Sequence, residues 1–146
     1  MKQIINYLES HIEPLIDYWL STYYVKSDEY ELRKNVDGFL DAQRKETLAL
    51  FLTAFENIRK GACAVPVFEE IGEDRRDMNT SFKDVYTNYH AVYTAAIEFV
   101  DVQIQTGKAD FSLEDYSKFI LFFRKLELNS GRHLFEGFLK RQDSSY

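Results

Sequence analysis

The longest periodic run of the chain, from Ser81 to Gln105, is the feature that most limits what it can fold into. Apolar side chains recur there every three or four residues, which is the spacing of one face of an α-helix. A second apolar set, at Val92, Ala95, Phe99 and Val102, widens that face. The ridge left over is narrow: Asp84, Asn88, Ala91, Thr94, Glu98 and Asp101. A helix that is apolar on most sides packs inside a domain, so we expect this one at its centre.

Other segments also carry helical periodicity, and none alternates with period two for long. Start signals are expected at Ser10, which forms a capping box with Glu13, and at Ser27, Ser81 and Ser112. Gly61 and Gly107 are expected to end helices, and residues 129–131 to break the last one. We therefore predict an all-α, single-domain fold of about six to seven helices. The helices are expected over residues 10–24, 29–38, 39–60, 66–78, 81–105 and 112–128, with a short helical lead-in over 2–9 and a last segment over 132–142.

Composition limits the class of protein. With 146 residues the chain has the size of one domain, and a net charge of −6 disfavours nucleic acid and anionic membranes as partners. Cys63 is the only cysteine, so we expect a structural thiol and no disulfide. The first ten residues do not resemble a signal peptide, and no apolar run is long enough to span a membrane. We expect a cytoplasmic protein.

The sequence offers little that could support catalysis. None of the three histidines, His11, His90 and His133, has a glutamate three residues before it, so the di-iron bundle motif does not occur. There is no phosphate-binding glycine loop. We therefore expect no enzyme, no metal site and no resident cofactor. Trp19 is expected in the core, and Arg75 and Arg76 on a solvated face.

His90 is the titratable group of most interest, because it falls between Tyr86 and Tyr93 on the face expected to be buried. One interpretation is a core histidine that bonds a tyrosine or a carbonyl. The other is a proximal ligand to haem iron. A haem globin that senses gas therefore remains an alternative, as does a helical interaction module without a ligand.

Three stretches resemble a known family when taken together: the opening YLESHIEPLIDYWLST, the charged FEEIGEDRRDMN leading into SFKDVYTNYHAVYTAAIEF, and the final SLEDYSKFILFFRKLELNSGRHLFEGFLKRQ. Their order is similar to that of the haem-less globin-like sensor domains of bacterial stressosome proteins and sporulation histidine kinases. Within that group, the chain most resembles freestanding, plasmid-borne sensor-domain proteins of the anthrax bacillus that inhibit sporulation.

The resemblance implies a haem-less globin-like fold with a hydrophobic tunnel for a fatty acid, a small anion nearby, and a homodimer formed through the C-terminal helices. It also implies regulation of a sensor histidine kinase pathway. Because the sequence contains no phosphoacceptor helix or ATP-binding domain, we expect a lone sensor that competes with the kinase or titrates its signal.

Two groups of residues follow as candidates. Polar donors that converge on one stretch of the central helix could hold the ligand's carboxylate, and rings of the last helices could line the tunnel. The expected ligand-binding residues are Tyr86, Tyr89, His90, Tyr93, Phe119 and Phe123. Residues 115–139 are apolar on more than one face, so we expect them to form the dimer. The expected interface residues are Tyr116, Phe122, Lys125, Phe135 and Phe138.

Overall fold

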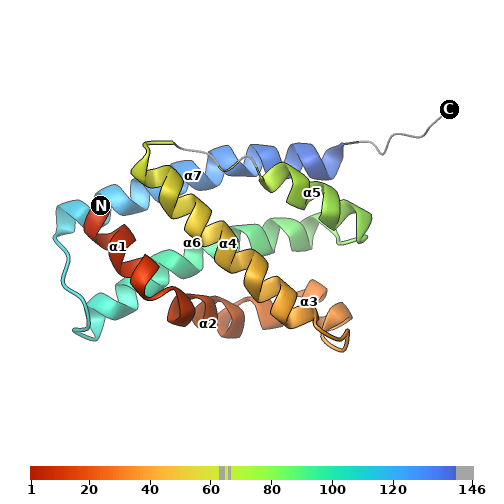
Figure 1. The fold of residues 1–146 in the computed structure, drawn as a ribbon, viewed down its shortest axis with the longest axis horizontal. Coiled ribbons are helices and arrows are strands. Elements are labelled where there is room, and N and C mark those ends of the chain that lie inside the picture. The colour runs from red at the N-terminus through yellow and green to blue at the C-terminus, as the bar shows by residue number, and fades with distance from the viewer. Residues whose placement is uncertain (63–64, 66, 141–146) are drawn as a thin grey trace.

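A computed structural model of the chain describes residues 1–62, 65 and 67–140. These residues form seven α-helices and one short 3-10 helix, with no strand among them, which confirms the predicted all-α fold (Figure 1). The helices are α1 (Lys2–Ser10), α2 (Ile12–Thr22), η1 (Tyr24–Lys26), α3 (Asp28–Arg33), α4 (Phe39–Arg59), α5 (Phe68–Asp77), α6 (Phe82–Gln105) and α7 (Leu113–Leu139).

Local cap signals placed most helix ends correctly. The side chains of Ser27, Ser81 and Ser112 each accept a hydrogen bond from the backbone N–H three residues on. Gly61 and Gly107 take the left-handed conformation, as predicted for residues that follow a helix. The capping box at Ser10 was wrong: Ser10 ends α1 and its hydroxyl donates to the carbonyl of Tyr7.

Two predicted boundaries were also wrong. The helix expected over residues 29–38 ends at Arg33. The break expected at residues 129–131 does not occur, and α7 continues through it. Ser130 and Gly131 are buried there, and the Ser130 hydroxyl accepts a hydrogen bond from the backbone N–H of Val65 at 2.9 Å. These small residues allow neighbouring segments to approach α7 without breaking it.

The central helix α6 packs against α1, α2 and α7, and α4 crosses over it in the view of Figure 1. Its buried residues include Tyr89, Tyr93 and Phe99, which join the main core. Trp19 of α2 is 1% exposed, as predicted for a core residue. Asp84 and Ala91, expected on the polar ridge, are buried instead.

The closest helix contact is between α5 and α7, which lie side by side at the top of Figure 1. A Cβ atom added at Gly72 of α5 would overlap the backbone carbonyl of Leu134, and one added at Gly137 of α7 would overlap that of Glu69. The two glycines therefore let the backbones touch, and this contact fixes α5 relative to α7.

Some predictions fall on positions outside the described residues: the structural role of Cys63, the helix start at Pro66 and the end of the last helix at residue 142. Within the described part of the chain, no helix combines the length and apolar character that crossing a membrane requires.

Candidate functional site

A small cavity of about 50 Å³ lies where α4 crosses α6. Its lining combines apolar and polar side chains. The residues with polar groups, which we call the polar end, are Trp19, Tyr24, Glu29, Gln43, Glu46, Thr47, Arg75 and Asn88, and the remaining walls are Leu50, Phe68, Ile71, Val85, Tyr89, Val92 and Leu134. Ligand pockets usually measure about 300–1,000 Å³. The cavity alone is therefore too small for a fatty acid.

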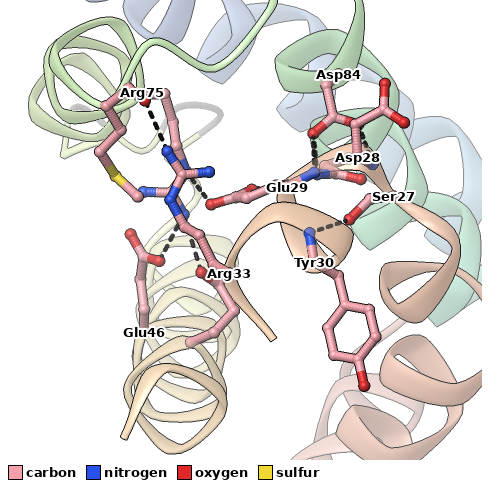
Figure 2. Close-up of polar contacts among 11 residues, drawn as sticks. Ser27, Asp28, Glu29, Tyr30, Arg33, Glu46, Arg75 and Asp84 are labelled. Carbon is pink, nitrogen blue, oxygen red and sulfur yellow. Dashed lines mark hydrogen bonds and ion pairs between the residues drawn. The ribbon is translucent and has the colours of Figure 1, made fainter. Parts of the chain in front are cut away.

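A buried ion cluster borders the polar end of the cavity (Figure 2). The Arg75 side chain is only 12% exposed, with its Nε 3.0 Å from Glu29 Oε1 and its Nη2 2.8 Å from Glu46 Oε2. Its expected place on a solvated face was wrong, because the sequence could not show that α3 and α4 each bring a glutamate to it. The cluster links three helices through one guanidinium.

Burial and pairing act against each other in this cluster. Burial raises the pKa of Glu29 above its usual value, because the attraction of Arg75 does not outweigh desolvation and the nearby carboxylates Asp84 and Glu46. For Arg75, burial acts to lower the pKa, and Glu29 and Glu46 outweigh it, so the pKa is raised. One arginine shared by two glutamates is thus held as a cation, while Glu29 binds protons more readily than a solvated glutamate.

The short helix α3 is held in place by polar contacts at both ends. The Asp84 carboxylate of α6 accepts hydrogen bonds from the backbone N–H groups of Asp28 and Glu29, at 3.1 and 2.9 Å (Figure 2). At the other end, Arg33 donates to the carbonyl of Met78 at 2.6 Å. A carboxylate at a helix N-terminus is stabilised by the helix dipole. Asp84 thereby positions Glu29 at the cavity.

A larger space of about 410 Å³ opens on the outer side of α6 and α7. We refer to it as the α6–α7 groove, and its walls are Tyr86, Tyr89, His90, Arg124, Glu127, Leu128, Gly131, Arg132 and Phe135. The rings of Tyr86 and Phe135 lie nearly parallel, with centroids 6.0 Å apart. The groove has the size of a ligand pocket and combines aromatic walls with cationic side chains.

Glu127 organises the polar side of the groove. Its Oε2 lies 2.6 Å from His90 Nδ1, and its Oε1 accepts a hydrogen bond from Arg124 at 2.7 Å. The second imidazole nitrogen, Nε2, lies 3.3 Å from the hydroxyl of Thr94. Among the described residues, the Arg132 guanidinium has no hydrogen-bond or ion-pair partner. It is therefore the cation most available to an anionic group in the groove.

Tyr89 is the one described residue that lines both the cavity and the groove. Its hydroxyl bonds the Tyr93 hydroxyl at 3.2 Å and donates to the carbonyl of Glu127. Burial raises the pKa of the Tyr89 hydroxyl far above its usual value. The ring thus forms a wall between the two spaces and is tied to α7 on its far side.

The expected ligand residues divide into two sets. Tyr86, Tyr89 and His90 come together in the α6–α7 groove. The expectation that His90 lies on the buried face was wrong, since its side chain is 47% exposed and points between helices rather than into the core. Tyr93, Phe123 and Phe119 contact one another in turn inside the core, where their rings fill the space.

The expected interface residues lie along α7 at different depths. Lys125 is exposed, while Tyr116 and Phe122 are half-buried against the core. Phe135 and Phe138 pack against Phe82 of α6, so part of their surface is already covered within the chain.

The sequence analysis missed Arg124, Glu127 and Arg132 of the groove and the pairing of Glu29 with Arg75. The i, i+3 spacing of Arg124 and Glu127 was a readable signal for a helix-surface ion pair. No comparable signal existed for residues that meet across different helices. In the described residues, no cluster of three or more histidine, cysteine, aspartate or glutamate side chains is suited to a metal ion.

Comparisons of the chain with models of protein families, with curated proteins and with solved structures found no match.

Proposed function

We propose that the chain is a non-enzymatic sensor module that binds a fatty-acid-like carboxylate at the α6–α7 groove. Through that ligand it regulates sporulation signalling, by competing with a sensor histidine kinase or titrating its signal. The observation that carries the ligand part is the groove itself, which joins aromatic walls to Arg132, Arg124 and His90 in about 410 Å³.

Each end of such a ligand has a counterpart in the groove. A carboxylate accepts bidentate hydrogen bonds from a guanidinium, and Arg132 has its donors free. An apolar chain would lie on Tyr86 and Phe135, and each buried methylene contributes about 0.8 kcal/mol. With the Tyr89 ring displaced, the chain would continue into the cavity, so that the two spaces together form the tunnel.

The geometry around His90 supports binding rather than hydrolysis. Thr94, His90 and Glu127 follow the order hydroxyl, imidazole, carboxylate. Thr94, however, lies inside α6, where the backbone N–H groups already bond helix carbonyls. Acyl transfer needs donors aimed at a developing oxyanion, and a helix interior does not supply them. The order hydroxyl, imidazole and carboxylate is therefore not sufficient for a hydrolytic site.

The signalling part of the proposal rests on the resemblance of the helix order to sporulation sensor domains. A sensor of the same kind would take up the kinase's ligand or pair with the kinase's own sensor. Homodimerisation through α7 belongs to the same proposal, and its test is given in the Discussion.

Native mass spectrometry of the purified protein tests the ligand part. We expect a labile adduct with the mass of a fatty acid that disappears on denaturation. Arg132→Gln should reduce retention about tenfold or more, as expected for the loss of one charge-assisted hydrogen bond. Lys108→Gln, an exposed change outside both the groove and α7, is the matched control. An adduct of haem mass, or an unliganded protein that gains no thermal stability with fatty acids, would contradict the proposal.

Spore counts test the signalling part. Expression of the chain in a sporulating host should lower the count, and Arg132→Gln should restore it while Lys108→Gln should not. Equal counts with and without expression would rule out the inhibitory role.

A further inference from the structure

Among the described residues, three buried polar atoms of side chains that line the cavity have no hydrogen-bond partner: Trp19 Nε1, Tyr24 Oη and Glu29 Oε1. The Trp19 and Tyr24 side chains are both 1% exposed. Glu29 Oε1 is ion-paired with Arg75 Nε at 3.0 Å, without the alignment of a hydrogen bond. An unpaired buried polar atom costs about 1–3 kcal/mol. Trp19 Nε1 and Tyr24 Oη, which have neither a hydrogen bond nor an ion pair, therefore indicate that the cavity has an occupant.

The required chemistry of that occupant follows from the three atoms. Trp19 Nε1 can only donate a hydrogen bond, and Glu29 Oε1 accepts one when the carboxyl is ionised. A group that accepts a hydrogen bond from Trp19 and donates one to Glu29 satisfies both atoms at once. The Tyr24 hydroxyl can donate a hydrogen bond to this group or accept one from it. The size of the cavity, about 50 Å³, limits the group to a few heavy atoms.

The surrounding charges indicate that the group is neutral. The polar end holds the carboxylates of Glu29 and Glu46 and the guanidinium of Arg75. A ligand carboxylate would be repelled by Glu29 and Glu46, and an ammonium group, which can only donate hydrogen bonds, could not accept one from the Trp19 indole N–H. A hydroxyl has the right size, hydrogen-bonding pattern and charge.

We infer that this polar end binds a terminal hydroxyl group, and that the sensor's ligand is an amphipathic carboxylate hydroxylated at the end remote from its head. The inference rests on the proposed function, because the head is placed in the α6–α7 groove. The apolar walls between the two ends, among them Phe68, Val85 and Leu134, match an alkyl chain.

The route between groove and cavity passes Tyr89. Its hydrogen bonds to Tyr93 and to the Glu127 carbonyl must open for the chain to pass. The ring borders Gly131, which has no side chain, and lies edge-on to Phe135 of the groove. On this route, a swing of the Tyr89 ring past Phe135 would join the groove to the polar end of the cavity.

Calorimetric titration with dodecanoic acid and with its ω-hydroxylated counterpart tests the inference. The hydroxylated acid should bind about tenfold more tightly, the effect of one to two buried hydrogen bonds. Trp19, the only tryptophan of the chain, should change its fluorescence emission more with the hydroxylated acid, since its indole N–H gains an acceptor.

Tyr24→Phe is the diagnostic variant, because it removes one polar atom of the site and keeps the ring. It should reduce the preference for the hydroxylated acid, whereas Tyr30→Phe, outside the cavity, should leave it unchanged. Equal affinity for both acids, or a preference that Tyr24→Phe does not alter, would overturn this inference alone and leave the proposed function in place. Binding of neither acid would overturn both.

Discussion

Tyr89 lines both the groove and the cavity, and on the proposed ligand route its hydroxyl defines a test at the scale of one oxygen atom. Tyr89→Phe keeps the ring but removes the bonds to Tyr93 and to the Glu127 carbonyl. The free energy of unfolding should fall by about 1 kcal/mol. Ligand association, followed by stopped-flow fluorescence, should become faster because the ring swings more easily.

The matched control is Tyr30→Phe. Tyr30 lines neither the groove nor the cavity, and its hydroxyl has no partner among the described residues. Stability and association rate should therefore stay at the wild-type values. If Tyr89→Phe and Tyr30→Phe behave alike, Tyr89 is not the barrier.

Glu29 gives the chain a defined pH response. Its pKa is raised in the folded protein above the usual value of 4.5, so at pH values between the two the folded state binds more protons than the unfolded state. Stability therefore falls as pH rises through this window and returns as pH falls toward 4.5. We expect the free energy of unfolding of the wild type, measured relative to Glu29→Gln, to increase as pH is lowered.

Urea unfolding at several pH values measures this difference. Glu31→Gln, on the same helix but exposed, is the control and should show no such trend relative to the wild type. A wild-type advantage over Glu29→Gln that grows with rising pH would show that the ion pair with Arg75 outweighs burial.

At the same scale, the sequence predicted features that depend on neighbours along the chain and missed those that depend on neighbours in space. The caps at Ser27, Ser81 and Ser112 lie three residues from their donors, so the spacing alone predicted them. The burial of Arg75 depends on Glu29 and Glu46, which reach it from other helices. No periodicity within α5 could indicate that.

Between elements, the contact of α5 with α7 should be the most sensitive to added volume. Gly72→Ala and Gly137→Ala each place a methyl group against backbone that cannot move aside. We expect each to lower the free energy of unfolding by at least about 1–3 kcal/mol, the usual cost of overpacking. Urea denaturation measures the loss.

The same measurement on Ser117→Ala supplies the control, since Ser117 is exposed on α7 and alanine is the better helix former. It should be neutral or slightly stabilising. If Gly72→Ala has the wild-type free energy of unfolding, then α5 and α7 can move apart without a loss of stability.

Helical periodicity explains why the helices were predicted more accurately than the side of each helix that is buried. It identified α4 and α6 correctly and predicted both parts of α7 with a break that does not occur, but it gave only the average direction of the core. His90 lies at the edge of the buried side of α6, where a small rotation of the helix determines whether the side chain faces the core or the groove. The groove could not be foreseen either, because its walls combine residues of α6 with residues of α7.

For the molecule as a whole, an apolar row on the outer side of α7 remains uncovered. Leu121 and Leu128 are 65% and 63% exposed, and Lys125 lies between them. Their seven-residue spacing is that of a helix pair. We expect a homodimer through this row, which Leu121→Asp and Lys125→Glu should weaken, shifting the mass measured by light scattering toward the monomer.

Leu32→Asp controls for the loss of any exposed leucine, because Leu32 is 73% exposed on α3. It should leave the mass unchanged. Wild-type mass for both α7 variants would place the interface elsewhere, and a monomeric wild type would remove dimerisation from the proposal.

The paired glycines of α5 and α7 also predict which positions should be retained among homologues. A surface groove can change its ligand through single substitutions, but a backbone contact that excludes even a methyl group tolerates none at Gly72 or Gly137. Homologues that keep this fold should therefore retain glycine at both positions after the ligand-binding residues have diverged. Those two positions, more than the aromatic residues of the site, would identify distant relatives of this chain.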